Sequence, residues 1–281
     1  MVNVGPDKTK RYNIMNDPHV NALIYKVTTA KDVDYDKAMP FSEECADFTL
    51  SIDGQKAAFK MKRHFATEEE ARKLVDNFLQ RWSISIGLEY TPDEIKFVFE
   101  SAEVIDRNPP KETCNSKSRI VRVSALALAS SIASASVHIS SSKFPSLPQN
   151  FAVTTDVETM YFRYKAYREN RETLTSMAYM CLTILEASAG SRCRRKNASQ
   201  KYFIRFDVLD KLGELVSERG SKSEARKMPN GRTFTPLTQN EKVWIEKAIK
   251  KIILRVGEQA LDPQKQLPEI TMNDFIGLDK N

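Results

Sequence analysis

The first hundred residues contain several short runs in which apolar and polar side chains alternate, a pattern that is typical of β-strands. We expect strands at residues 20–28, 48–52 and 57–63. Asp53-Gly54 joins the second and third runs, and Asp-Gly between two alternating runs is a strong signal for a β-hairpin. The sequence therefore predicts an antiparallel sheet in its N-terminal half.

Helical spacing of apolar residues begins after Thr67. Thr67 and Glu70 have the spacing of a capping box, in which the threonine hydroxyl accepts a free helix N–H and the glutamate reaches back. Alternation returns at residues 95–105, and residues 118–139 are strand-like and rich in Ala and Ser. Residues 20–105 are thus expected to form a sheet packed on one helix.

From residue 156 onward the apolar period changes to that of amphipathic helices. We expect one long helix that Asp156 caps and Gly190 ends, and then helices at 206–219 and 238–261. Residues 267–276 are expected to be a tail docked on these helices. The inward positions are expected to be Leu174, Met177, Ala178, Cys181, Leu182 and Leu185, then Val208, Leu209, Leu212, Leu215 and Val216, then Ile245, Ala248, Ile249, Ile252 and Val256.

The two patterns meet at residues 143–149, a proline-containing segment that cannot be helical. The predicted fold class is therefore α+β, with an N-terminal antiparallel sheet and packed helix and a helical C-terminal domain. The expected parts are a flexible tail at 1–17, a β-rich α+β domain at 18–143, and a helical domain at 150–281 that includes the docked tail.

Positive charge is concentrated in the helical half. The chain of 281 residues has a formal net charge of +6. Residues 161–232 hold 16 Lys and Arg against 8 Asp and Glu, whereas the remaining residues hold 27 against 29. A local excess of positive charge favours anionic partners.

Nine basic residues of this half are the candidate binding residues. A positive field beside tyrosines is what phosphate neutralisation and base stacking require. The alternative interpretation is that the tyrosines belong to the core and that the charges form a solvated face. The nine residues are Arg163, Arg168, Arg171, Arg194, Arg195, Lys196, Arg219, Arg226 and Lys227.

The same half contains a candidate helix-turn-helix between Ala198 and Val216. Its first helix would cover residues 197–202, and its second would begin near Asp207. Phe203 occupies the turn position where glycine is usual. Reading of DNA through this element is a further alternative.

Residue types that several catalytic mechanisms need are scarce. The histidines are His19, His64 and His138, so a Ser-His-Asp or Cys-His arrangement confined to the helical half is excluded. We interpret His64 as a surface or turn residue and His138 as a strand residue. No pair of histidines has metal-ligand spacing and no glycine-rich phosphate loop is present, so we expect no metal and no cofactor.

The expected location is the cytoplasm. The first twenty residues lack the apolar run of a secretory signal, and no window is long and apolar enough for a membrane span. The four cysteines, Cys45, Cys114, Cys181 and Cys193, lack metal-binding spacing. We expect reduced thiols rather than disulfides.

An ordered series of short motifs resembles a bacterial family named MauJ. The resemblance covers about residues 144–276. The family name refers to its occurrence with methylamine-utilization genes and implies no reaction. The motifs are Arg163-Tyr164-Lys165-Ala166-Tyr167, Met177-Ala178-Tyr179, Cys181-Leu182-Thr183, Lys211-Leu212-Gly213-Glu214-Leu215, Ala225-Arg226-Lys227 and Pro236-Leu237-Thr238.

The predicted arrangement of a helix pair, a polar loop after an Arg-bearing helix end and a closing amphipathic helix is similar to HEPN-type helical domains. Active members of that group are ribonucleases that use an Arg and a nearby His for acid–base chemistry. Arg219 has the corresponding place here, but no His follows it. The resemblance therefore implies a non-catalytic variant that serves in binding or assembly.

These observations favour a non-enzymatic binding or accessory protein whose basic helical domain engages RNA, DNA or an acidic protein. One alternative is a nucleic-acid-acting protein, either a helix-turn-helix reader or an unconventional HEPN-like nuclease. Another is an enzyme that acts on small molecules. A membrane partner is not expected.

Overall fold

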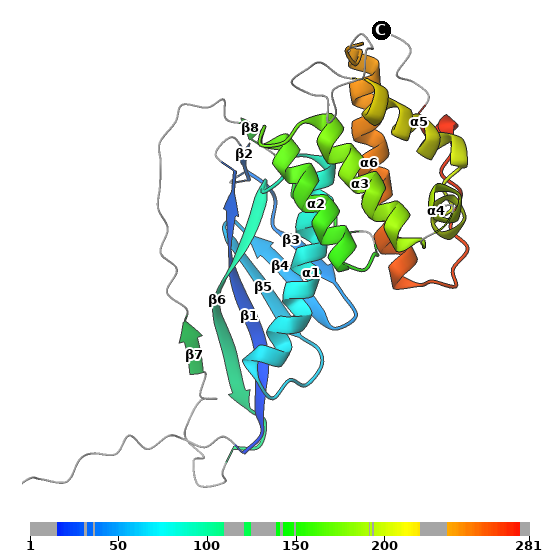
Figure 1. Ribbon diagram of the computed structural model, residues 1–281. Helices are drawn as coiled ribbons and strands as arrows, with labels where there is room; N and C mark the ends of the chain where they lie inside the picture. Colours follow the sequence, from blue (N-terminus) through cyan, green and yellow to red (C-terminus); the bar gives the residue numbers. More distant parts are fainter. Residues whose placement is uncertain are drawn as a thin grey trace, which may run out of the picture. The chain divides into compact units, whose positions relative to one another are not determined.

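The computed structural model contains a sheet with one long helix, followed by a group of helices (Figure 1). It describes residues 16–30, 33–35, 37–109, 121–124, 139–140, 143–148, 150–190, 192, 194–219 and 235–275. The N-terminal elements are β1 (Pro18–Thr29), β2 (Val33–Asp34), β3 (Phe41–Glu44), β4 (Phe48–Asp53), β5 (Lys56–Met61), α1 (Glu68–Glu89), β6 (Ile95–Asp106), β7 (Val121–Ser124) and β8 (Ile139–Ser140).

The main sheet has the strand order β3-β4-β5-β1-β6-β7, and all neighbouring strands are antiparallel. β2 and β8 form a separate parallel pair. The predicted hairpin is confirmed, because β4 pairs with β5 in a register that sets Asp53 opposite Lys56. Gly54 in this turn has a φ of 54°, a conformation that glycine adopts without steric cost. The rest of the expected strand at 118–139 lies outside the described residues.

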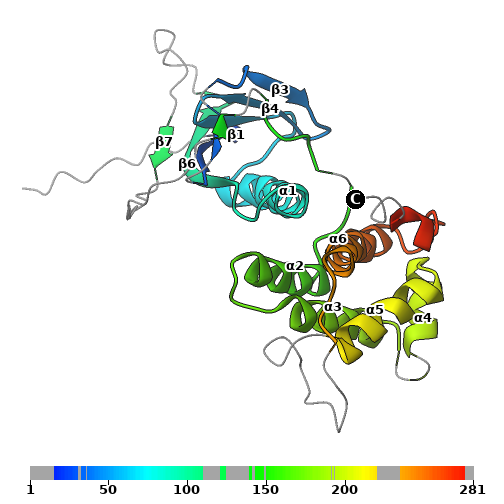
Figure 2. The same cartoon turned by 90° about the horizontal axis from the view of Figure 1, so that it is seen from above.

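One face of the sheet packs against α1 (Figure 2). Leu50 of β4 and Phe59 of β5 are paired in register and fully buried, as the alternating pattern predicts. The hydroxyl of Tyr25 on β1 donates a hydrogen bond of 2.6 Å to Asp76 of α1. The predicted antiparallel sheet with a packed helix is therefore confirmed.

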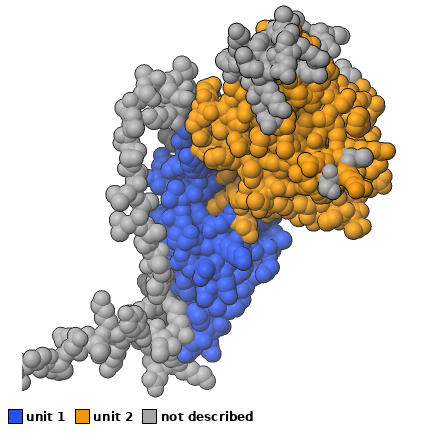
Figure 3. All heavy atoms as spheres, in the orientation of Figure 1, with its two compact units in different colours: residues 1–76, 95–144 blue, residues 77–94, 145–281 orange. Residues whose placement is uncertain are grey.

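α1 begins at the predicted cap and contributes to two compact units. The Glu70 amide donates to Thr67 Oγ1 at 3.3 Å. Beyond Asp76 the helix belongs to the helical unit, whose core includes Ile84 and Leu88. The sequence analysis assigned all of this helix to the N-terminal part. One unit comprises residues 1–76 and 95–144, and the other comprises residues 77–94 and 145–281 (Figure 3).

The helical unit buries the apolar stripes that the sequence predicts. All sixteen expected inward positions, from Leu174 to Val256, are buried. No helix in the described part of the chain combines the length and apolar character needed to cross a membrane. The helices are α2 (Thr155–Arg168), α3 (Leu174–Ser188), α4 (Arg194–Tyr202), α5 (Phe206–Glu218) and α6 (Gln239–Leu261), with a short 3-10 helix at Met272–Phe275.

The prediction of one long helix from Asp156 to Gly190 is wrong. The chain turns between α2 and α3, where Asn170 has a φ of 57°. Asn tolerates this left-handed conformation better than most residues. Thr173 then caps α3 by accepting from the Ser176 amide, and Thr154, rather than Asp156, caps α2. Two N-caps and one left-handed asparagine therefore replace the expected continuous helix.

Gly87→Ala should destabilise the protein although alanine is the better helix former. Gly87 faces Tyr161 of α2, and a Cβ there would overlap the tyrosine hydroxyl. We expect the free energy of unfolding to fall by about 1–3 kcal/mol, because overpacking outweighs a gain in helix propensity of about 1 kcal/mol. Urea unfolding measures this change. Adding Tyr161→Phe should recover part of the loss, and a Gly87→Ala protein that is more stable than the parent would contradict the described α1–α2 contact.

Candidate anion-binding surface

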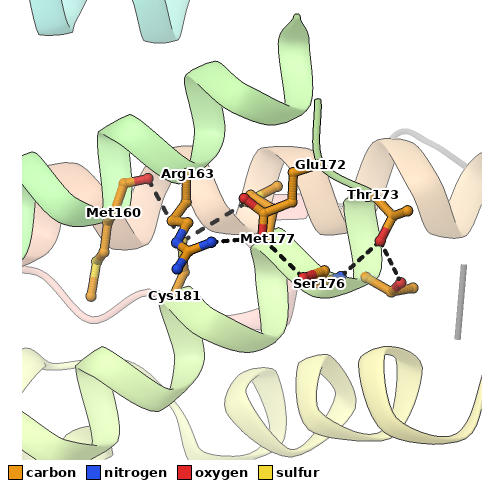
Figure 4. A network of polar contacts seen from close by, with 8 residues as sticks. Met160, Arg163, Glu172, Thr173, Ser176, Met177 and Cys181 are labelled. Carbon is orange, nitrogen blue, oxygen red and sulfur yellow. Dashed lines mark hydrogen bonds and ion pairs between the residues drawn. The ribbon is translucent and has the colours of Figure 1, made fainter. Parts of the chain in front are cut away.

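Arg163 of α2 is compensated by Glu172, which lies in the connection to α3 (Figure 4). Its Nη1 lies 3.4 Å from Glu172 Oε1, and the glutamate side chain is only 9% exposed. Glu172 also accepts a hydrogen bond of 2.9 Å from Ser176 Oγ. A nearly buried carboxylate needs a cation and donors around it. Arg163 therefore stabilises the α2–α3 connection.

Arg168 at the end of α2 pairs with Glu246 of α6 at 3.2 Å. The same carboxylate accepts from the Tyr164 hydroxyl at 3.0 Å and pairs with Lys250 at 3.4 Å. Tyr164 is fully buried, and burial raises the pKa of its hydroxyl, which therefore remains protonated and able to donate. For Tyr164, the interpretation as a core residue is confirmed.

Arg171 and Arg219 also have carboxylate partners. Arg171 lies in the α2–α3 connection rather than on a helix, and its Nε donates to Glu169 at 2.8 Å. Arg219 follows α5 and lies 3.7 Å from Glu241 of α6. Arg226 and Lys227 lie outside the described residues. The prediction of a basic patch did not anticipate these carboxylates.

Arg195 of α4 points back into the helical unit. It donates from Nε to Glu186 of α3 at 2.8 Å and from Nη1 to Asp210 of α5 at 2.9 Å. Burial opposes the charge, but these two hydrogen bonds raise the pKa of Arg195 overall. Its guanidinium packs on Gly213, where a Cβ would come within 2.6 Å. Arg195 thus anchors α4 to its neighbours.

A cluster of cations lies on α4 and the residues that flank it, from Arg192 to Arg205, and we call this stretch the basic segment. Between Glu186 and Asp207 the sequence has six Lys and Arg and no Asp or Glu. Arg192 and Lys196 are exposed and make no ion pair with any residue that the structure describes. Besides the inward-pointing Arg195, the cations of the basic segment are Arg192, Arg194, Lys196, Lys201 and Arg205. Arg205 pairs with Asp207 of α5 at 2.8 Å.

Arg255 of α6 is buried and hydrogen-bonds to the backbone of the turn that follows α4. Arg255 is only 6% exposed, and its Nη1 donates to the carbonyls of Tyr202 and Phe203, both at 2.9 Å. Its Nε donates to Glu258 at 3.0 Å. Phe203 has a φ of 50°, which few non-glycine residues adopt. The position of α4 therefore depends on a buried cation that satisfies two carbonyls of this turn.

The C-terminal tail supports the same turn. Ile204 and Ile270 form a parallel bridge, in which the Ile270 amide donates to Phe203 and the Arg205 amide donates to Ile270. Ile270 and Phe275 are buried in the helical core. The docked tail that the sequence predicts is therefore confirmed over its described residues.

The exposed face of α5 does not suit DNA reading. In the helix-turn-helix interpretation α5 would enter the major groove, so its exposed residues would meet phosphates and base edges. These residues include Asp207, Asp210 and Glu214. Carboxylates repel phosphates and, among base edges, accept mainly from cytosine N4. The charge of α5 thus disfavours this alternative.

Other groups with potential chemistry in the described residues do not form a reactive or metal-binding site. Cys181 is fully buried, and burial raises the pKa of its thiol to about 12, so it is a poor nucleophile. Within the described residues, no group of three or more His, Cys, Asp or Glu side chains is arranged to hold a metal ion. An open hollow on the surface of α1 is lined only by charged side chains, from Glu68, Glu69, Arg72, Lys73 and Asp76.

Sequence reasoning missed Arg255, which positions the basic segment without belonging to it. Arg255 lies among the apolar residues Ile252, Ile253 and Val256 on a helix. A charged residue inside such a stripe is a signal for a buried cation with specific partners, because an uncompensated buried charge is costly. The partners themselves are backbone carbonyls, which no sequence pattern identifies.

Comparisons with protein-family models, with curated proteins and with solved structures find no match for this chain. The resemblances to the MauJ family and to HEPN-type domains therefore stay predictions. The candidate surface has to be judged from its own geometry and charge.

Arg255→Met should destabilise the helical unit and loosen α4. The variant removes the guanidinium from the Tyr202 carbonyl and leaves the Phe203 carbonyl with the Ile270 amide as its remaining donor. We expect a loss of about 2–4 kcal/mol in the free energy of unfolding. Urea unfolding measures the loss, and hydrogen exchange at the Ile204 amide reports on the turn. Lys247→Met, an exposed lysine on the same helix, is the control. Equal stability of the two variants would show that Arg255 does not hold the turn.

Proposed function

We propose that this protein is a non-enzymatic binding protein whose helical unit docks on an anionic partner through the basic segment. The observation that carries the proposal is a division among the cations of this unit. One set is compensated by carboxylates of the same unit, whereas Arg192 and Lys196 of the basic segment make no ion pair with a described residue. The compensated set comprises Arg163, Arg168, Arg171, Arg195, Arg205 and Arg219.

Charge compensation decides which cations are available to a partner. A carboxylate beside a guanidinium neutralises part of its charge and occupies some of its N–H donors, so its attraction for another anion is weaker. Arg192 and Lys196 have no such ion pair among the described residues. They keep their attraction for an incoming phosphate or carboxylate.

The support beneath α4 strengthens the proposal. Ala198 and Tyr202 are buried, and the Tyr202 hydroxyl lies 2.7 Å from Ser188 Oγ of α3. Lys201 Nζ donates to the Ser188 carbonyl at 2.7 Å. A helix that is fixed before binding loses less conformational freedom when a partner docks. The basic segment thus combines exposed positive charge with a rigid base.

Binding to anionic probes tests this function. We expect the full chain to bind mixed RNA or duplex DNA of about 20 nucleotides, or polyglutamate, at about 50 mM salt and to lose affinity steeply at about 200 mM. Preference for a nucleic acid or for polyglutamate identifies the class of partner. Fluorescence anisotropy with labelled probes is suitable. Absence of binding to all three probes at the lower salt concentration would contradict the proposal.

The double variant Arg192→Gln/Lys196→Gln locates the binding surface. For a nucleic-acid probe, it should reduce the magnitude of the log–log salt slope by about 2, because each cation accounts for about one phosphate contact. For polyglutamate, the affinity at low salt should fall. The matched control is Lys247→Gln/Lys265→Gln, which removes two exposed positive charges outside the basic segment. Equal losses in both double variants would show that net charge, rather than the basic segment, governs binding.

A further inference from the structure

Two histidines far apart in the sequence lie against each other at one end of the sheet. His19 is near the start of β1, and His64 follows β5. Their ring centroids are 5.3 Å apart and their planes differ by 22°, so the rings are stacked. His19 is only 4% exposed, whereas the His64 side chain is 43% exposed. The sequence analysis did not bring these two residues together.

The buried ring of His19 has a defined hydrogen-bonding role. Its Nδ1 accepts from the Phe65 amide at 3.5 Å, and the Val20 amide donates to the Phe65 carbonyl at 2.9 Å. The segment that joins β5 to α1 is thereby fastened to the start of β1. Nδ1 can accept only while it carries no proton, so this role requires a neutral His19.

The surroundings of His19 oppose a positive charge on its ring. Among the described residues, the charged and titratable groups that act on His19 are Asp17 ahead of β1, His64 after β5 and Arg107 after β6. The carboxylate of Asp17 lies toward the outer ring, with Oδ1 3.7 Å from His64 Nε2. A proton on His19 would face Arg107 and have little contact with water.

We propose that the His19–His64 stack is a proton-controlled latch, which holds the start of β1 on the β5–α1 connection at neutral pH and releases it in acid. In the closed state His19 Nδ1 carries no proton. A proton on His19 Nδ1 replaces the acceptor of the Phe65 amide with a donor and places a buried charge against the His64 ring. The contact then opens locally.

The direction of the pH dependence follows from the burial of His19. Burial, Arg107 and His64 together lower the pKa of His19 below its usual value of 6.5. The open and unfolded states therefore bind the proton more tightly than the closed state does. The stability of the contact is complete above about pH 6.5 and is lost as the pH falls from there through the lowered pKa of His19.

Nuclear magnetic resonance of the full chain tests the latch. We expect hydrogen exchange at the Phe65 and Val20 amides, corrected for intrinsic rates, to accelerate roughly tenfold between about pH 7.5 and pH 5, while the Leu50 amide in the middle of β4 stays protected. An unchanged rate at Phe65 would overturn the proposal. Opening of Leu50 together with Phe65 would also overturn it, since acid would then act on the whole sheet.

Two variants separate the roles of the histidines. His64→Gln should shift the imidazole titration of His19 to higher pH, because a repelling neighbour is gone. His19→Asn keeps an acceptor near the position of Nδ1 and cannot bind a proton, so exchange at Phe65 should become independent of pH over this range. Lys60→Gln, an exposed residue of β5, is the control, with expected behaviour like that of the parent. A His19 titration that His64→Gln leaves unmoved would overturn the coupling.

Discussion

The helical unit depends on the pairing of its arginines with carboxylates of the same unit. A guanidinium that is partly withdrawn from water requires a compensating anion, and a nearly buried carboxylate such as Glu172 requires a cation. Arg163, Arg168 and Arg195 meet this requirement by joining α2, α3, α5 and α6 through Glu172, Glu246, Glu186 and Asp210. Five of the nine candidate binding residues, Arg163, Arg168, Arg171, Arg195 and Arg219, are therefore part of the architecture.

Arg192 and Lys196 of the basic segment take no part in this pairing within the described residues. The helix of this segment is fixed by Arg195 on one side and by the turn that Arg255 and the C-terminal tail hold on the other. The pairing of cations with carboxylates thus explains two features of the candidate surface, namely its fixed helix and its exposed positive charge. Compensated cations build the support, and Arg192 and Lys196, which make no ion pair with a described residue, are exposed on it. Binding through such a surface is electrostatic and sensitive to salt.

Periodicity and local turn chemistry were sufficient to predict most of the fold. Alternation predicted β4 and β5, Asp53-Gly54 predicted their hairpin, and the stripes from Leu174 onward predicted the buried faces of the helices. The break between α2 and α3 was missed, although Asn170 and Thr173 are the residue types that end and begin helices. The candidate site was less predictable, because the carboxylate partners of its arginines lie on other helices. Glu246 is 78 residues from Arg168, and Asp210 is 15 residues from Arg195. Tertiary packing alone brings such pairs together.

Arginine footprinting of the free protein tests the division among the cations most directly. A dicarbonyl reagent at low concentration, followed by peptide mass spectrometry, gives a modification rate for each arginine. The account predicts that Arg192 reacts much faster than Arg163, Arg168 and Arg195, because its guanidinium has no carboxylate partner among the described residues. Equal rates at these four positions would contradict the claim that internal carboxylates set the basic segment apart.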